Sequence, residues 1–179
     1  MHFREMNIGK NKRAGKKVKA LYRAAFPKEE RLPFWVLRFL TVQRSVVCTA
    51  YFEGDKFCGF AYTVTSGDIL FVLFFAVPAA LRGKGVGSAI LSQMKEKGKT
   101  VILNIEPPDE NAENYEERLC RKRFYEKNGF FDTGYDIEEI GGTFRVFSTE
   151  KSLDVTAYKK VFRRMTFGFW DVKIEKGTS

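Results

Sequence analysis

One short segment of the sequence combines glycine with basic residues directly after an apolar run. Arg82-Gly-Lys-Gly-Val-Gly87 places three glycines within five residues. Glycine has no Cβ, so a ligand can approach its backbone closely. The N–H groups at the start of a helix attract an anion, and Arg82 and Lys84 add positive charge beside them. We therefore predict that residues 82–87 form a phosphate-binding loop.

The spacing of the glycines excludes the two phosphate loops with the best-known patterns. Counted from Gly83, the Walker A pattern requires a glycine where this chain has Ser88. The dinucleotide-binding pattern also fails at Ser88, because Gly85 and Gly87 are separated by one residue rather than two. The expected anion site therefore rests on backbone chemistry and not on either pattern.

Proton transfer in this chain must use groups other than histidine. The only histidine is His2, which excludes Ser–His and Cys–His catalytic arrangements and most metal clusters. The cysteines, Cys48, Cys58 and Cys120, lack metal-ligand spacing and are expected to be reduced thiols. Carboxylates, tyrosines and lysines remain as candidates for acid–base chemistry.

The hydrophobic pattern predicts a strand before the loop and a helix after it. Residues 69–77 are apolar at nearly every position, which indicates a strand buried on both faces. After the loop, apolar residues recur at helical spacing up to Gly98. Further strands are predicted at 2–7, 45–52, 57–65, 101–106, 130–137 and 144–150, and helices at 13–25, 33–40 and 114–128. This order, an antiparallel meander followed by a β-α-β crossover, predicts a mixed sheet with helices on its faces.

Composition is that of a globular chain of one domain. The 179 residues are 44% hydrophobic and 30% charged, and no apolar run approaches the ~20 residues that span a bilayer. The first residues lack the apolar core of a signal peptide. We therefore expect a cytoplasmic protein without a membrane partner.

Positive charge is concentrated near the N-terminus. The net charge is +9, and residues 1–50 hold 12 Lys/Arg against 3 Asp/Glu. A solvated basic face is the simplest interpretation, and attraction of an anionic ligand or a nucleic acid is the alternative. We do not expect a nucleic acid partner, because the charged face lacks interleaved aromatic residues.

Two motifs resemble a known enzyme family. Arg82-x-x-Gly85-x-Gly87 is similar to the pyrophosphate loop of the GNAT superfamily of acyl-CoA N-acyltransferases, written [Q/R]-x-x-G-x-[G/A]. Residues 123–130, Arg-Phe-Tyr-Glu-Lys-Asn-Gly-Phe, resemble the second signature of that family, F-Y-x-x-x-G-F. The resemblance covers residues 45–135 well and the helical N-terminal region loosely.

The resemblance implies a fold and a co-substrate. The fold is of the mixed α/β (α+β) class, with a mostly antiparallel central sheet flanked by helices and splayed between its fourth and fifth strands. One domain is expected over residues 1–179, with residues 150–179 as a C-terminal extension docked on it. Acetyl-CoA or coenzyme A is implied as co-substrate, without a metal. The residues implied to bind it are Phe75, Ala76 and Val77 through the pantetheine arm, Arg82, Gly83, Lys84, Gly85, Val86, Gly87 and Ser88 through the pyrophosphate, and Tyr125.

Two side chains are implied to take part in the reaction. Tyr125 matches the family tyrosine that faces the departing sulfur, where a phenol can stabilise or protonate a thiolate. The alternative for Tyr125 is packing within its helix. Glu106 ends the strand beside the expected cleft, where family members often place a base. Its competitors are Asp109 and Glu110, or a role as a solvated strand-end charge.

Two positions depart from the family pattern. Arg118 replaces an asparagine common seven residues before the tyrosine, and Arg121 replaces a common alanine. The asparagine's role is therefore not transferred to this chain. These arginines lie either near the coenzyme's 3′-phosphate or in solvent, and we expect solvent.

The implied reaction is transfer of an acetyl or other acyl group to a primary amine of a small molecule or peptide by direct attack. The alternative is a catalytically silent CoA-binding or interaction module on the same fold. Acceptor specificity is expected from residues 26–40 and 135–147, where Phe34 and Trp35 either line a pocket or fill the core. The C-terminal extension closes the cleft, pairs with a second subunit as a homodimer, or fills core; its predicted aromatic cover includes Phe169 and Trp170.

Overall fold

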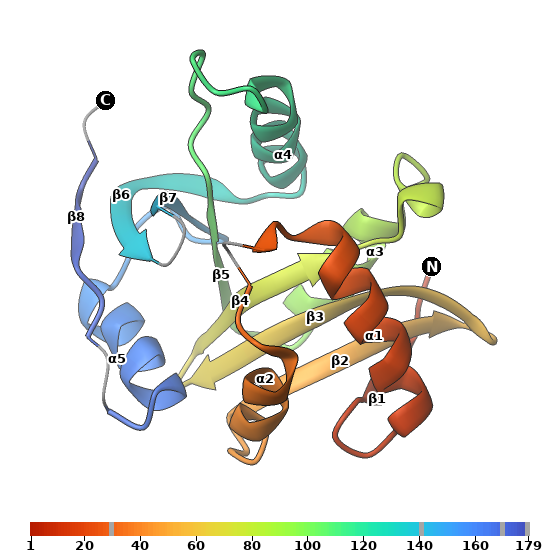
Figure 1. Ribbon diagram of the computed structural model, residues 1–179. Coiled ribbons are helices and arrows are strands. Elements are labelled where there is room, and N and C mark those ends of the chain that lie inside the picture. Colours follow the sequence, from red (N-terminus) through yellow and green to blue (C-terminus); the bar gives the residue numbers. More distant parts are fainter. Residues whose placement is uncertain (29–30, 140–141, 169–170, 178–179) are drawn as a thin grey trace. The chain divides into compact units, whose positions relative to one another are not determined.

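The computed structural model describes residues 1–28, 31–139, 142–168 and 171–177 (Figure 1). The elements run in the order β1 (Arg4–Asn7), α1 (Lys12–Ala25), α2 (Phe34–Leu40), β2 (Val46–Glu53), β3 (Lys56–Ser66), β4 (Ile69–Ala76), the 3₁₀ helix η2 (Ala79–Leu81), α3 (Val86–Lys95), β5 (Thr100–Ile105), α4 (Tyr115–Lys127), β6 (Phe131–Glu139), β7 (Gly142–Ser148), α5 (Val155–Met165) and β8 (Ile174–Lys176).

The strands form one mixed sheet of eight strands, in the order β1-β2-β3-β4-β5-β7-β6-β8. β4 and β5 are parallel, and the sheet is otherwise mostly antiparallel. This confirms the predicted α/β class with its antiparallel meander and crossover. The chain forms two compact units, a first unit of residues 1–65 and 72–98 and a second of residues 66–71 and 99–179, so β4 belongs to both. The splay between β4 and β5 and the single domain over 1–179 stay predictions.

In the first unit, α1 and α2 cover one face of the sheet (Figure 1). Asn11 caps α1 by accepting a hydrogen bond from the Ala14 N–H at 2.9 Å. The Tyr22 ring on α1 packs edge-on against Phe60 of β3 and Phe74 of β4. Such aromatic burial is a large part of the apolar area that holds a helix on a sheet.

α3 covers the opposite face of the sheet in the first unit. Gly59 of β3 points toward it, because a Cβ on Gly59 would lie 3.3 Å from Ile90 Cδ1. At the edge of the sheet, the Gln93 side chain accepts a hydrogen bond from the Phe3 N–H and donates one to the Phe3 carbonyl, each at 2.9 Å. α3 is therefore fixed to the sheet by apolar packing and by a side-chain amide that binds the chain just before β1.

In the second unit, α5 contributes to the core. Asp154 caps the helix by accepting from the Ala157 N–H at 2.9 Å. The rings of Tyr158 and Phe162 contact Phe71 at the start of β4. Of the three roles considered for the C-terminal extension, the contacts of α5 within its own unit match core filling. Phe169 and Trp170, expected as an aromatic cover, lie outside the described residues.

The sequence pattern located the strands and α-helices from β1 to β7, with ends that differ by a few residues, but it did not predict the 3₁₀ helix η2. It missed β8, where Val172 and Ile174 alternate with charged residues over a segment too short for a periodic signal. β8 pairs antiparallel with β6, with Tyr135 opposite Lys176. In the part of the chain that the structure describes, no helix combines the length and the apolar character needed to cross a membrane.

Candidate functional site

The predicted phosphate loop ends at an uncapped helix N-terminus. α3 begins at Val86, and its N-cap is Gly85, which provides no side-chain hydrogen bond. The first N–H groups of a helix have no partner within the helix, so they remain available to an acceptor from outside. Gly83 and Gly85 have φ of 72° and 76°, and a Cβ on either would meet nothing within 4 Å. The backbone amides thus border open space at the positive end of the α3 dipole.

Two buried side chains fix the ends of this loop. Leu81, at the end of η2, and Val86, the first residue of α3, are 8% and 6% exposed, whereas residues 82–85 between them are exposed. Arg82 Nε donates to the Val77 carbonyl at 3.4 Å, so this side chain turns back toward the end of β4. Apolar burial at two points holds an exposed glycine segment in a left-handed conformation that glycine adopts readily.

The end of β4 is where the pantetheine contacts are predicted. Ala76 is buried, while Phe75 and Val77 are half-buried. β4 ends at Ala76, and Pro78, which follows Val77, has no N–H to donate. Backbone groups of Phe75 to Val77 therefore lie near the loop in the first unit, and their contact with a coenzyme stays a prediction.

Tyr125 lies in the second unit near the end of α4. Its ring packs against Phe124 and Phe130, and it is 8% exposed. Burial raises the pKa of Tyr125 to about 12, and the positive charge of Arg121 acts in the opposite direction. Among the described residues, none forms a hydrogen bond with its hydroxyl. At neutral pH the side chain is therefore a neutral phenol that can donate a hydrogen bond.

Glu106 follows β5 in the same unit and is paired with two arginines. Its Oε1 lies 2.8 Å from Arg118 Nη2, and its Oε2 lies 3.0 Å from Arg121 Nη1. The Glu106 side chain is 15% exposed, and those of Arg118 and Arg121 are 20% and 41% exposed. The expectation that the arginines face solvent is wrong for Arg118, which is mostly buried, whereas Arg121 keeps 41% of its side chain exposed; the carboxylate at the end of β5 binds both. Neighbouring Asp109 and Glu110 are exposed.

The predicted residues fall into two groups, each assembled within one unit. The end of β4 and the glycine loop belong to the first unit, whereas Glu106 and Tyr125 belong to the second. Sequence reasoning missed the two arginine partners of Glu106. The spacing of these arginines could have indicated their role. Arg118, Arg121 and Tyr125 follow one another at three and four positions, so all three share one face of the predicted helix.

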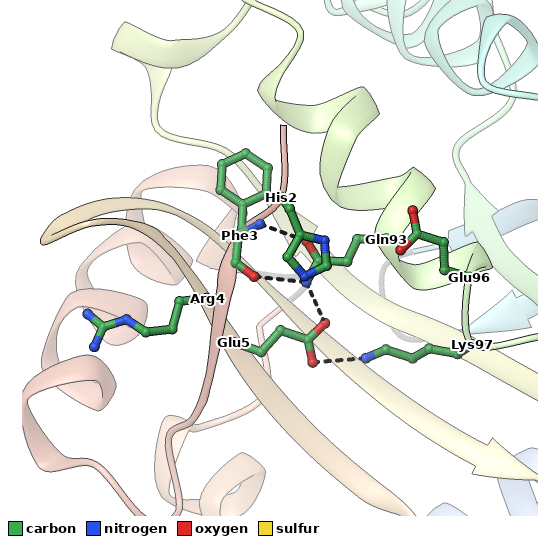
Figure 2. Close-up of a pocket in the computed structure, with 7 residues that line it drawn as sticks. All are labelled: His2, Phe3, Arg4, Glu5, Gln93, Glu96 and Lys97. Atoms are coloured by element: carbon green, nitrogen blue, oxygen red, sulfur yellow. Dashed lines mark hydrogen bonds and ion pairs between the residues drawn. The ribbon is translucent and has the colours of Figure 1, made fainter.

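A cavity of about 580 Å³ lies between the N-terminal segment and α3 in the first unit (Figure 2). Its lining is formed by His2, Phe3, Arg4, Glu5, Gln93, Glu96 and Lys97. Several of the polar groups bind one another: Gln93 binds the Phe3 backbone and Glu5, and Lys97 lies 3.1 Å from Glu5. None of the predicted site residues lines this cavity. Within residues 1–28, 31–139, 142–168 and 171–177, no group of three or more His, Cys, Asp and Glu side chains is placed to hold a metal ion.

Comparison with known proteins assigns the chain to a protein family. Residues 43–131 match the family model of the acetyltransferase (GNAT) domain. The chain belongs to the GNAT acetyltransferase family. This match includes the end of β4, the glycine loop, Glu106 and Tyr125.

Individual relatives of this GNAT protein support the same assignment. It is 36% identical over 63 residues to YjbC, a predicted acetyltransferase of Bacillus subtilis. The alignment covers 35% of this chain and 31% of YjbC, so the chain spans about a third of the length of that relative.

Solved structures show the fold. A GNAT-family protein from Bacteroides thetaiotaomicron has a TM-score of 0.75 at 21% identity, over 95% of this chain and 100% of that one. A Bacillus subtilis acetyltransferase in complex with CoA has a TM-score of 0.56 at 17% identity, over 82% and 97% of the two chains.

Proposed function

We propose that this GNAT protein transfers the acetyl group of acetyl-CoA to a primary amine of a small molecule or peptide. The observation that carries the proposal is the uncapped N-terminus of α3, where Gly83 and Gly85 leave open space beside the backbone. Such a terminus suits a pyrophosphate, because the amides donate hydrogen bonds and the helix dipole favours negative charge. Arg82 and Lys84 are exposed beside it and add attraction for the anion. The family assignment and the CoA bound to the Bacillus subtilis relative support the same ligand.

In the proposed reaction, the amine nitrogen forms a bond to the thioester carbonyl carbon and the carbon–sulfur bond breaks. The sulfur leaves as a thiolate, and the nitrogen loses a proton. We assign Tyr125 to the thiolate as a hydrogen-bond donor. Burial raises the pKa of Tyr125 to about 12, whereas a free thiol has a pKa of about 8.5. Complete transfer of the phenolic proton would therefore be uphill by about 5 kcal/mol, so stabilisation of the thiolate is the favoured role.

The proton of the amine is the second requirement. The sequence-based hypothesis assigns it to Glu106, whose two carboxylate oxygens are each paired with a guanidinium group. Glu106 would accept the proton on a remaining lone pair, and the loss of its negative charge would then force a rearrangement of both arginine pairs. Attack by the fraction of the acceptor that is already uncharged, with the proton passing to water, does not need that rearrangement. We therefore favour water over Glu106 as the proton acceptor.

The same observation favours a second candidate function, a CoA-binding module without catalysis. If no amine acceptor binds beside the thioester, the chain binds the coenzyme at the α3 N-terminus and releases no thiol. A cytoplasmic location and a homodimer stay predictions from the sequence.

Calorimetry with CoA and acetyl-CoA tests the binding step. Ligand at 100 times its Kd stabilises a folded protein by about 2.7 kcal/mol, so a rise in Tm provides a parallel measurement. We expect both ligands to bind, and failure of the folded protein to bind either would contradict the proposal. Release of free CoA across a panel of amines then separates the enzyme from the silent module.

A further inference from the structure

α4 carries Tyr125 but has little apolar surface with which to dock. In this helix of 13 residues, only Tyr125 is buried. A surface helix is usually oriented by an apolar stripe about 100° wide that faces the core. The half-buried Tyr115, Leu119 and Phe124 do not lie along one face with Tyr125. Apolar packing therefore defines the rotation of the helix about its axis only weakly, and polar contacts contribute to it.

Those polar contacts converge on Glu106. Arg118 and Arg121 bind different oxygens of its carboxylate, at 2.8 Å and 3.0 Å. Arg118 is itself held at two further points: its Nε donates to Asn114 Oδ1 at 2.7 Å, and its Nη1 donates to the Pro107 carbonyl at 3.3 Å. Arg118 therefore joins the first residues after β5 to the N-terminal end of α4.

The three side chains of α4 that take part share one face. Arg118, Arg121 and Tyr125 are related by steps of three and four residues, which places them in one row along the helix. A rotation of α4 that broke the arginine pairs would therefore also move the Tyr125 hydroxyl. Charge-assisted hydrogen bonds to a mostly buried carboxylate resist such a rotation better than exposed ion pairs do.

We propose that Glu106, Arg118 and Arg121 form a clamp that fixes the rotation of α4 and thereby positions the Tyr125 hydroxyl. The inference rests on the proposed function for its effect on turnover, although the clamp itself is a structural arrangement within the second unit. Glu106 is then a positioning residue and not the base. Arg118 is the main partner, because it is less exposed than Arg121 and makes two further hydrogen bonds.

The kinetic test uses Glu106→Gln, Arg118→Gln and Arg118→Lys. The matched control is Arg123→Gln, which removes an exposed cation from the opposite side of the same helix. We expect kcat with acetyl-CoA and a reactive amine to fall at least tenfold in the two Gln variants of the clamp, with partial rescue in Arg118→Lys and no change in the control. The Kd for CoA should stay within twofold of the wild type in all four variants.

The pH–rate profile separates a clamp from a base. In Glu106→Gln, a clamp lowers the rate at every pH and leaves the acidic limb in place. If the acidic limb disappears with Glu106, the carboxylate is the base and the proposal is wrong. A kcat that is unchanged in Arg118→Gln overturns it as well.

A measurement that needs no turnover keeps the clamp separate from the proposed function. Proteins labelled with ¹³C at tyrosine Cζ give a resonance for Tyr125 that Tyr125→Phe identifies. We expect this resonance to shift or broaden in Arg118→Gln and to stay in place in Arg123→Gln. An unmoved resonance in a folded Arg118→Gln protein refutes the clamp. A moved resonance in a chain that acetylates no amine supports the clamp and refutes only the proposed function.

Discussion

The carbonyl oxygen of Ala76 on β4 lies 2.6 Å from the position that a Cβ on Gly59 of β3 would occupy. The close approach occurs beside a bulge: Gly59 pairs with Tyr51 and Phe57 pairs with Phe52, which leaves Cys58 as the extra residue. Bulges bend a strand and redirect its neighbours. Gly59 thus allows β4 to bring its last carbonyl close to β3, directly before the segment that leads to the phosphate loop.

Replacing this glycine should move the end of β4. We expect Gly59→Ala to destabilise the protein by about 1–3 kcal/mol, as overpacking usually does, and to weaken CoA binding. Guanidinium unfolding and calorimetry measure the two effects. Gly54→Ala is the control, because Gly54 also has a positive φ but has nothing within 4 Å of its Cβ position. If the two variants lose CoA affinity equally, the Gly59–Ala76 contact is not what shapes the site.

The second prediction concerns the backbone of the phosphate loop. Gly85 and Gly98 precede and follow α3, both have a left-handed φ, and both border open space. An alanine at either position is therefore strained by about 1–2 kcal/mol. We expect similar losses of stability in Gly85→Ala and Gly98→Ala, but a loss of CoA affinity in Gly85→Ala alone. Equal affinity in both variants would place the coenzyme elsewhere.

The sequence predicted the parts of this fold that depend on local rules. Apolar runs, turn glycines and a β-α-β order were enough to place the strands and α-helices from β1 to β7, including a helix directly after the glycine loop. The partners of Glu106 could not be found in this way. The apolar pattern of α4 is weak, and the orientation of this helix depends on pairing of Glu106 with side chains that lie 12 and 15 residues further along the chain. Local rules could not predict the contact of Gln93 with the backbone of Phe3 either, because these residues lie 90 positions apart in the sequence.

Removal of the Tyr125 hydroxyl tests its proposed contact with the thiolate. A positioned acid or donor typically contributes about 10²–10⁴-fold to a rate, so Tyr125→Phe should lower kcat by about 10²-fold while the Kd for CoA changes little. Stopped-flow or steady-state release of free CoA provides the measurement. A Phe variant with the wild-type kcat would remove Tyr125 from the reaction.

Alkaline pH should unfold this protein through its buried tyrosines. Burial raises the pKa of Tyr22 and Tyr125 to about 12, and raises the pKa of Tyr51 and Tyr62 as well. Because the folded pKa exceeds the unfolded value of about 10, this contribution to stability is complete below pH 10 and is lost as the pH rises toward 12. A tyrosine whose pKa rises from about 10 in the unfolded chain to about 12 in the folded protein accounts for about 3 kcal/mol of that loss. Urea unfolding from pH 8 to 11.5 should show a falling free energy, with a shallower slope in Tyr22→Phe; equal slopes would contradict the assignment.

The last prediction concerns how the N-terminal segment is held. The buried amide of Gln93 forms two hydrogen bonds with the Phe3 backbone and one with Glu5, whereas Lys97 forms an exposed ion pair with Glu5 (Figure 2). Gln93→Met leaves the Phe3 N–H and carbonyl without their partners, which costs about 1–3 kcal/mol per buried group. Access of water from the adjacent cavity reduces this cost, so we expect a total loss of about 2 kcal/mol.

Lys97→Met removes only the exposed pair and should cost about 0–1 kcal/mol. Hydrogen exchange at the Phe3 amide should accelerate strongly in Gln93→Met and hardly at all in Lys97→Met. If both variants exchange at the same rate, the strand pairing of β1 with β2 holds the segment without help from α3.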